Sequence, residues 1–388
     1  MPPSHEELWG RAQQLLPKLK ERAARCEELR RIPDETLRDF HDAELLRIHQ
    51  PRRVGGAELE FVAVVTFGAL LAGACASSSW NFINFLSHHL MLGMFPPLAQ
   101  DEIWGKSPDT LIASSFVFPA AKARKVKDGY LISGRWPFSS GVDPSEWNML
   151  AGLAFLDDNA PPEQRIFLLQ RSQYRIIDNW FAGGLRGTGS KDVEATEEFV
   201  PEHRTLAVAD TKGGPTPGSA VNPGPLFRMP VFALFPYMLS GVPLGIAESL
   251  IADYSSSRSG RMTGARIAEI QSTQIRLSEA TAYAGASRLV QETNCREAQN
   301  TISRNELFDT RTKARYRLEG AYAVEWAVRA VDVMFGLHGA SGLYESGPVA
   351  RAFRDAHAVK QHFSFNTDIA GTTYGRIALG LPSDNPTL

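Results

Sequence analysis

The chain has little cysteine, no charge bias and no long hydrophobic run, and each absence excludes a class of protein. Its 388 residues hold three widely spaced cysteines, Cys26, Cys75 and Cys295, which predict neither a disulfide framework nor a metal site. Lys and Arg total 41 against 43 Asp and Glu, so no basic surface favours nucleic acid or an anionic membrane. No run reaches the roughly 18 apolar residues of a membrane span, and the N-terminus lacks a signal-peptide pattern. We therefore expect a cytoplasmic protein.

The sequence also lacks a nicotinamide-binding fingerprint. Gly184, Gly187 and Gly189 lie in or beside the run Leu185-Arg-Gly-Thr-Gly-Ser-Lys-Asp-Val193. A dinucleotide fingerprint requires a strand before such glycines and a helix after them. The residues that follow, 197–200, are instead typical of another strand. Reducing equivalents should therefore come from a separate protein.

Three patterns follow one another along the chain. Residues 1–110 have the apolar spacing of helices, residues 111–212 hold the short runs typical of a small β-barrel, and residues 213–388 return to long helical patterns. Helices are expected over 34–43, 62–73, 246–257, 265–294 and 306–335, with another from Val349. The long C-terminal helices predict a four-helix bundle. The expected fold class is mainly α with a central β domain.

A C-terminal segment lacks an acid where a related family has one. Arg351-Ala-Phe-Arg-Asp-Ala-His-Ala-Val-Lys-Gln-His-Phe-Ser-Phe365 follows a glycine-rich turn and Pro348. It resembles the flavin-site segment of the acyl-CoA dehydrogenase superfamily, in which a Glu after the Arg-Asp removes the α-proton of an acyl thioester. Here no acid lies between Asp355 and Asp368. The segment is more similar to the flavin-dependent monooxygenase branch, the oxygenase components of two-component aromatic hydroxylases.

The run Gly134-Arg-Trp-Pro-Phe-Ser-Ser-Gly141 supports this resemblance, because aromatic hydroxylases of the branch are similar in reading Trp-x-Phe-Ser-Ser-Gly. The resemblance implies that Ser140 hydrogen-bonds near flavin N5, with Phe138 beside the ring and Ser139 also at the cofactor. Taken alone, the run is equally consistent with a β-turn. Thr188 and Ser190 of the glycine loop are further implied flavin contacts, with a plain structural turn as the alternative.

The resemblance also implies a site for the flavin phosphates. Arg258 matches the arginine that holds a flavin phosphate in relatives, and Arg261 is the alternative. A solvated basic loop is the other interpretation of both. Gly339, Ala340 and Ser341 form a turn whose amides and hydroxyl suit a phosphate from a neighbouring subunit.

The resemblance also implies roles for histidines in substrate binding and proton transfer. His88, with His89 as the alternative, should contact the substrate together with Trp80 and either Ser115 or Ser114. His362 should lie over the flavin, where a pKa near neutrality suits handling a peroxide proton. His357 is the runner-up for that role. Either helical histidine could instead be an ordinary core residue.

These features predict the oxygenase component of a two-component flavin-dependent monooxygenase. It would take reduced FMN or FAD from a flavin reductase, form a C4a-hydroperoxyflavin with O2, and hydroxylate a phenolic or indolic substrate. The long C-terminal helices predict a homotetramer, as does the turn at residues 339–341 that would hold a phosphate from a neighbouring subunit. One alternative is an acyl-CoA dehydrogenase-like flavin oxidoreductase or oxidase, with Glu248 or Asp253 as its base. The other is a flavin-free binding scaffold.

Overall fold

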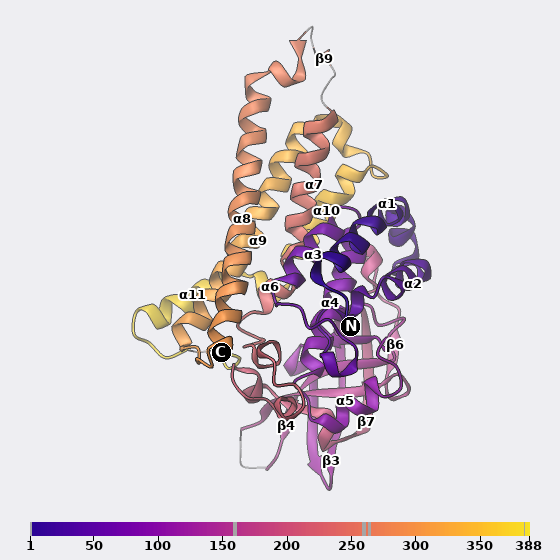
Figure 1. The fold of residues 1–388 in the computed structure, drawn as a ribbon, viewed down its shortest axis with the longest axis vertical. Helices are drawn as coiled ribbons and strands as arrows, with labels where there is room; N and C mark the ends of the chain where they lie inside the picture. Colours follow the sequence, from indigo (N-terminus) through magenta and orange to yellow (C-terminus); the bar gives the residue numbers. More distant parts are fainter. Residues whose placement is uncertain (1, 158–160, 258–260, 263–264, 384) are drawn as a thin grey trace.

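The computed structural model describes residues 2–157, 161–257, 261–262, 265–383 and 385–388. Helices form the N-terminal and C-terminal parts of the chain, and a sheet lies between them in sequence. In Figure 1 the sheet occupies the lower end of the molecule, the long C-terminal helices the upper end, and the N-terminal helices lie beside both. This arrangement confirms the expected fold class, mainly α with a central β domain.

The N-terminal part surrounds one fully covered helix. Its α-helices are α1 (His5–Leu29), α2 (Asp34–Asp42), α3 (Ala63–Ala72), α4 (Ala76–Leu92) and α5 (Pro97–Trp104). Ser4 caps α1 by accepting a hydrogen bond from the Glu7 amide in a capping box. On α4 every side chain except that of Asn84 is buried. Because α4 is covered on nearly all sides, its polar side chains also lie inside the protein, where burial favours hydrogen bonds to neighbouring segments.

The central part is a sheet with a core of its own. Its strands are β1 (Ile112–Ser115), β2 (Ala121–Val126), β3 (Gly129–Ser139), β4 (Trp147–Phe155), β5 (Glu163–Gln170), β6 (Arg175–Ile177), β7 (Lys191–Pro201) and β8 (Thr205–Ala207). Within the described residues the order is β6-β7-β3-β2-β4-β5-β8, with β1 parallel to β4. Trp136, Tyr130 and Phe167 are buried in this core. The β3–β7 register shifts between Trp136 and Ser139, which marks a β-bulge.

The C-terminal part is a helical bundle. Its α-helices are α6 (Phe235–Leu239), α7 (Gly241–Ser257), α8 (Gln271–Ser303), α9 (Thr310–His338), α10 (Pro348–Lys360) and α11 (Thr367–Ala378). The expectation of a helix from residue 265 is wrong at its start. Strands β9 (Arg261–Met262) and β10 (Ala265–Arg266) pair there, and α8 begins only after the extended N-cap residue Ile270.

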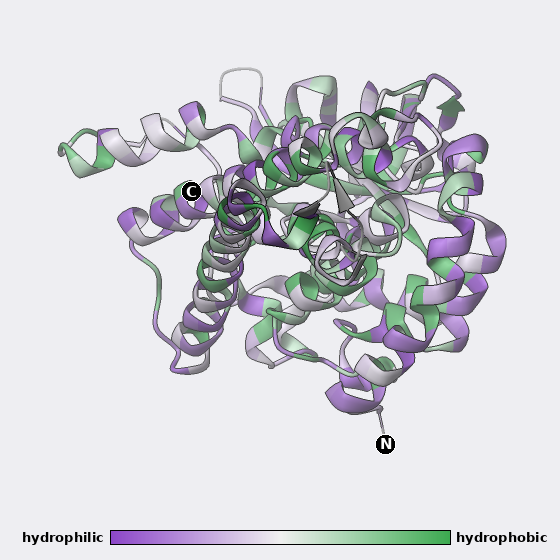
Figure 2. Ribbon diagram, turned by 90° about the horizontal axis from the view of Figure 1, so that it is seen from above, coloured by the Kyte–Doolittle hydropathy of each residue, from purple (hydrophilic) through white to green (hydrophobic). Residues whose placement is uncertain are grey.

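The N-terminal helices and the bundle share one hydrophobic core, because α3 and α7 meet at backbone distance. A Cβ added at Gly241 would lie 2.5 Å from the Val65 carbonyl oxygen, and one at Gly245 would lie 2.0 Å from that of Ala69. Figure 2 shows hydrophobic residues concentrated in the middle of the molecule and hydrophilic ones frequent on the peripheral helices. The three cysteines are free and buried. No helix in the described ranges is long and apolar enough to cross a membrane.

Gly245→Ala should destabilise the protein, because its methyl group has no space against α3. Overpacking of this kind typically costs about 1–3 kcal/mol. The matched control is Gly285→Ala on α8, where a Cβ would meet nothing within 4 Å. That control should be neutral, or stabilising by up to about 1 kcal/mol, because alanine favours the helix. Urea midpoints measure both variants. Equal midpoints for Gly245→Ala and the wild type would show that α3 and α7 can separate without cost.

Candidate functional site

A cavity of about 320 Å³ opens where the three parts of the chain meet. It contains seven of the sequence-predicted residues, Trp80, Ser114, Ser115, Phe138, Ser140, Ser190 and His362. Its other lining residues are Asn84, Phe116, Val117, Trp180, Leu185, Phe235, Leu239, Ala358, Gln361 and Phe363. Apolar and aromatic walls with a few polar groups are typical of a site for a flat organic molecule.

The bulge at the end of β3 directs Phe138 and Ser140 into this cavity. Phe138 has φ +64°, a left-handed conformation that is strained for a bulky residue and is found most often at functional sites. Gly141 follows with φ +69°, and a Cβ there would lie 2.7 Å from the Phe85 ring. Ser139 points the other way and accepts a hydrogen bond from Asn148 Nδ2 at 3.0 Å. Its side chain does not line the cavity, contrary to the expected cofactor contact.

A chain of hydroxyl groups ends at Ser140. Trp80 Nε1 donates to Ser140 Oγ at 3.0 Å, Ser140 Oγ lies 2.7 Å from Ser190 Oγ, and Ser190 Oγ lies 2.6 Å from Thr188 Oγ1. Thr188 Oγ1 in turn donates to the Leu185 carbonyl at 2.9 Å. Because a carbonyl only accepts, each hydroxyl donates towards Leu185. Thr188 is therefore buried behind Ser190 and supports the cavity without lining it.

His88 is the α4 histidine beside the cavity. Its Nδ1 donates to the Ile112 carbonyl at 2.5 Å, and burial lowers the pKa of His88 to about 4. The ring is therefore neutral, with a free electron pair on Nε2. It lies behind the lining residue Phe116, with ring centroids 6.3 Å apart. His89 instead accepts a hydrogen bond from Trp104 Nε1 at 3.2 Å and belongs to the core.

His362 follows the end of α10 and lies among aromatic rings. Its ring centroid is 5.8 Å from that of Phe235 and 5.8 Å from that of Trp80. Loss of water lowers the pKa of His362 to about 3, so the expectation of a pKa near neutrality is wrong. Nδ1 accepts from the Ser364 amide at 3.3 Å, which leaves the proton on Nε2. His362 is thus a neutral hydrogen-bond donor.

Other predicted residues lie away from this cavity. Gly339, Ala340 and Ser341 belong to an exposed 3₁₀ turn, Gly339–Leu343, after α9. Arg258 lies outside the described residues, as does the side chain of Arg261. His357 Nε2 lies 2.7 Å from Asp332 Oδ1 and is not among the lining residues.

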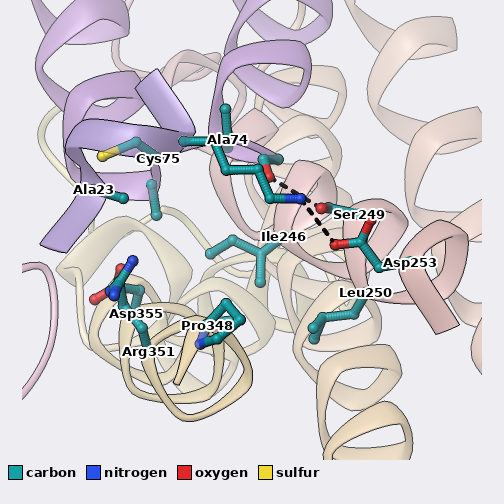
Figure 3. A pocket seen from close by; sticks show the side chains of 15 residues that line it. Ala23, Ala74, Cys75, Ile246, Ser249, Leu250, Asp253, Pro348, Arg351 and Asp355 are labelled. Carbon is teal, nitrogen blue, oxygen red and sulfur yellow. Dashed lines mark hydrogen bonds and ion pairs between the residues drawn. The ribbon is translucent and has the colours of Figure 1, made fainter. Parts of the chain in front are cut away.

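The carboxylates of the dehydrogenase alternative also lie elsewhere. Asp253 lines a separate cavity of about 110 Å³ (Figure 3). Its Oδ2 lies 3.4 Å from Lys20 Nζ, so it forms an ion pair there. Glu248 accepts from Arg288 Nε at 2.6 Å. Neither lines the larger cavity, and none of the described residues that do is acidic. The described part of the chain therefore provides no carboxylate base at this site.

Several lining residues were missed by sequence reasoning. Asn84 lies one helical turn after Trp80 on a buried helix, and this spacing could have indicated a shared face. Phe116 directly follows β1, and Phe235 begins α6. Their rings meet edge-to-face with centroids 5.8 Å apart. No local signal could have paired them, because their contact depends on the packing of separate segments.

Asp355 connects α10 to the glycine loop. Its Oδ1 accepts from the Leu185 amide at 2.6 Å, while its side chain also borders the smaller cavity (Figure 3). Burial raises the pKa of Asp355 to about 7, and the neighbouring Glu27 acts in the same direction. This carboxyl group therefore holds the loop that carries Thr188 and Ser190.

Comparisons with known proteins agree with this geometry. Residues 237–367 match the family described as acyl-CoA dehydrogenase, C-terminal domain. The chain is 34% identical to the oxygenase component of an FADH2-dependent resorcinol hydroxylase from Rhizobium sp., over 97% of this chain and 95% of the relative. It is 31% identical to that of p-hydroxyphenylacetate 3-hydroxylase from Acinetobacter baumannii, over 97% and 89% of the two chains. The crystal structure of 3-HSA hydroxylase from Rhodococcus sp. RHA1 superposes with a TM-score of 0.94 at 30% identity, covering 98% and 99%.

Fold and site together define a flavin enzyme built on the acyl-CoA dehydrogenase fold. The chain belongs to the family of oxygenase components of flavin-dependent monooxygenases. It is accordingly a reduced-flavin-dependent monooxygenase, and the dehydrogenase alternative is set aside.

Asp355→Asn should remove a pH-dependent loss of stability. Because the folded pKa of about 7 exceeds the ordinary value of 3.8, the folded state retains a proton that the unfolded state has released. Stability is therefore lost as pH rises from about 4 to 7. The free energy of unfolding of Asp355→Asn, relative to that of the wild type, should therefore increase by roughly 2–3 kcal/mol between pH 5 and pH 8. Urea unfolding at both pH values measures it, and a pH-independent difference would contradict the raised pKa.

Proposed function

We propose that this protein hydroxylates a phenol or an indole with O2 and a reduced flavin supplied by a separate flavin reductase. The observation that carries the proposal is the cavity itself. It joins aromatic walls to the hydroxyl chain ending at Ser140 and to the neutral His362. When bound, the reduced flavin supplies the activation of O2, so that one oxygen atom enters the substrate ring and the other leaves as water.

The residues of the cavity suit a flat flavin ring and a second ring beside it. Phe138 and Trp180 meet edge-to-face at a centroid distance of 6.4 Å at one side of the cavity. Ser140 would hold the edge of the flavin ring and His362 would donate from Nε2 to an oxygen above it. Apolar walls exclude water, which protects a reactive oxygen species from wasteful release as peroxide.

On the substrate side, His88 would accept a hydrogen bond from a phenolic O–H or an indolic N–H through its free Nε2. Ser115 Oγ donates to the Pro137 carbonyl at 2.6 Å, so it offers the substrate an electron pair and not a proton. Trp80 would position the substrate ring while its Nε1 holds Ser140. A hydroxyl group that donates a hydrogen bond to such an acceptor releases more electron density into its ring, which favours attack on electrophilic oxygen.

The finer assignments are also proposals. Because the Rhizobium relative is named as FADH2-dependent, we take FAD as the flavin, with FMN as the alternative. Relatives named for resorcinol and for p-hydroxyphenylacetate make both uncharged and carboxylate-bearing phenols candidate substrates.

We further propose a cytoplasmic homotetramer with domains over 1–110, 111–212 and 213–388. The exposed 3₁₀ turn at Gly339–Leu343 and the exposed Leu289 and Ile369 of the bundle support the assembly. Arg258 remains our candidate for the flavin phosphate.

The purified chain should not oxidise NADH at a useful rate, because its sequence contains no nicotinamide fingerprint. Addition of an unrelated flavin reductase, FAD and NADH should start the hydroxylation of a simple phenol. Product formation is followed by chromatography and NADH by absorbance. Rapid NADH oxidation by the chain alone would contradict the two-component proposal.

His362→Ala should lower the ratio of hydroxylated product to released hydrogen peroxide by about 5- to 150-fold, as expected for the loss of one hydrogen bond worth about 1–3 kcal/mol. Affinity for reduced flavin should change little. The matched control is His357→Ala, which removes a histidine of the same helical region that pairs with Asp332 outside the cavity. If the ratio of product to peroxide fell in His357→Ala and not in His362→Ala, the role proposed for His362 would belong to His357.

A further inference from the structure

The walls of the 320 Å³ cavity, as far as the structure describes them, carry no formal charge. Its described lining residues are aromatic, aliphatic or neutral polar, and none of them is Lys, Arg, Asp or Glu. His362, the titratable group among them, is neutral because its pKa is lowered to about 3. His88, behind Phe116, is neutral for the same reason. Among the described lining residues, a ligand in this cavity therefore meets hydrogen-bonding groups but no fixed countercharge.

Cations next to the lining residues are held by carboxylates outside the cavity. Lys191 follows Ser190, Lys360 precedes Gln361, and Arg354 lies one helical turn before Ala358. Each forms an ion pair directed elsewhere: Lys191–Asp143 at 2.8 Å, Lys360–Glu325 at 2.6 Å and Arg354–Glu27 at 3.0 Å. Arg186, beside Leu185, is a further nearby cation and does not line the cavity. Three of these four neighbouring cations are thus paired with carboxylates outside the cavity, and the fourth, Arg186, is not a lining residue.

This arrangement discriminates between ligands by charge. A carboxylate that enters a dry apolar cavity loses its hydration and requires a buried cation in compensation. A phenolic hydroxyl or an indole N–H requires only one or two hydrogen bonds, which groups such as Ser115 and His88 can supply. The same walls that exclude water therefore disfavour an anionic substrate.

We propose that the substrate is an uncharged phenol or indole, and that the cavity rejects ring compounds bearing a carboxylate. This inference rests on the proposed monooxygenase function and narrows its substrate class. It selects between the two kinds of phenol left open above.

Pairs of ligands with nearly equal shape test the effect of ligand charge alone. 4-Hydroxyphenylacetamide and 4-hydroxyphenylacetate differ in replacing a carboxylate by a neutral amide, and indole-3-acetamide and indole-3-acetate form a second pair. Binding to the flavin-free protein is read from quenching of tryptophan fluorescence, since Trp80 and Trp180 line the cavity. The amide of each pair should bind more than about tenfold tighter than the acid. Hydroxylation rates with an added reductase should follow the same order.

Variants at the rim provide the matched control. Gln361 is an exposed lining residue, so Gln361→Arg introduces a cation with little effect on packing and should improve acid binding by about tenfold. Gln361→Met, of similar length and uncharged, should not. Arg186→Gln should leave both ligands unaffected.

Each result has a distinct meaning. Acids that bind as tightly as their amides, or acid binding that depends on Arg186, overturn the uncharged-substrate inference and leave the monooxygenase function intact. Failure to hydroxylate any phenol or indole with a competent reductase overturns the function itself, and the inference with it.

Discussion

The site depends on one constraint: the polar backbone and hydroxyl groups of the buried loop from Leu185 to Ser190 require hydrogen-bond partners, and other parts of the chain supply them. Asp355 of α10 accepts the Leu185 amide, and the Leu185 carbonyl accepts the Thr188 hydroxyl. Asn81 of α4 donates to the Thr188 carbonyl at 3.1 Å. A loop buried without these partners would carry a desolvation cost for each unpaired group. These bonds therefore tie the bundle, the loop and the N-terminal helices together.

The cavity exists because those parts meet at this loop. The hydroxyl chain passes from the loop through Ser190 to Ser140 at the end of β3, and Trp80 of α4 closes it. The bulge with its positive φ at Phe138 turns the strand end towards the opening. No single part contains a complete site, so the chemistry requires all three to be packed.

The electrostatics of the cavity distinguish this enzyme from a dehydrogenase of the same fold. Proton abstraction from an acyl thioester requires a carboxylate beside the flavin, whereas the described walls here are neutral and Asp253 and Glu248 are engaged elsewhere. A neutral histidine with its proton fixed on Nε2 can hold an oxygen atom without titrating. The cavity thus presents a neutral histidine and no described carboxylate, whereas the dehydrogenase reaction requires a carboxylate base.

The sequence by itself determined the fold class, the branch of the superfamily and the segments that form the site, because these depend on local patterns. The run from Gly134 to Gly141 and the segment from Arg351 to Phe365 are continuous, so their motifs are readable without a structure. Only the tertiary structure decided that Ser139 faces the sheet, since a bulge sets which side chains point inward. Only burial among rings from other segments decided that His362 is neutral, because desolvation depends on contacts that no local pattern contains.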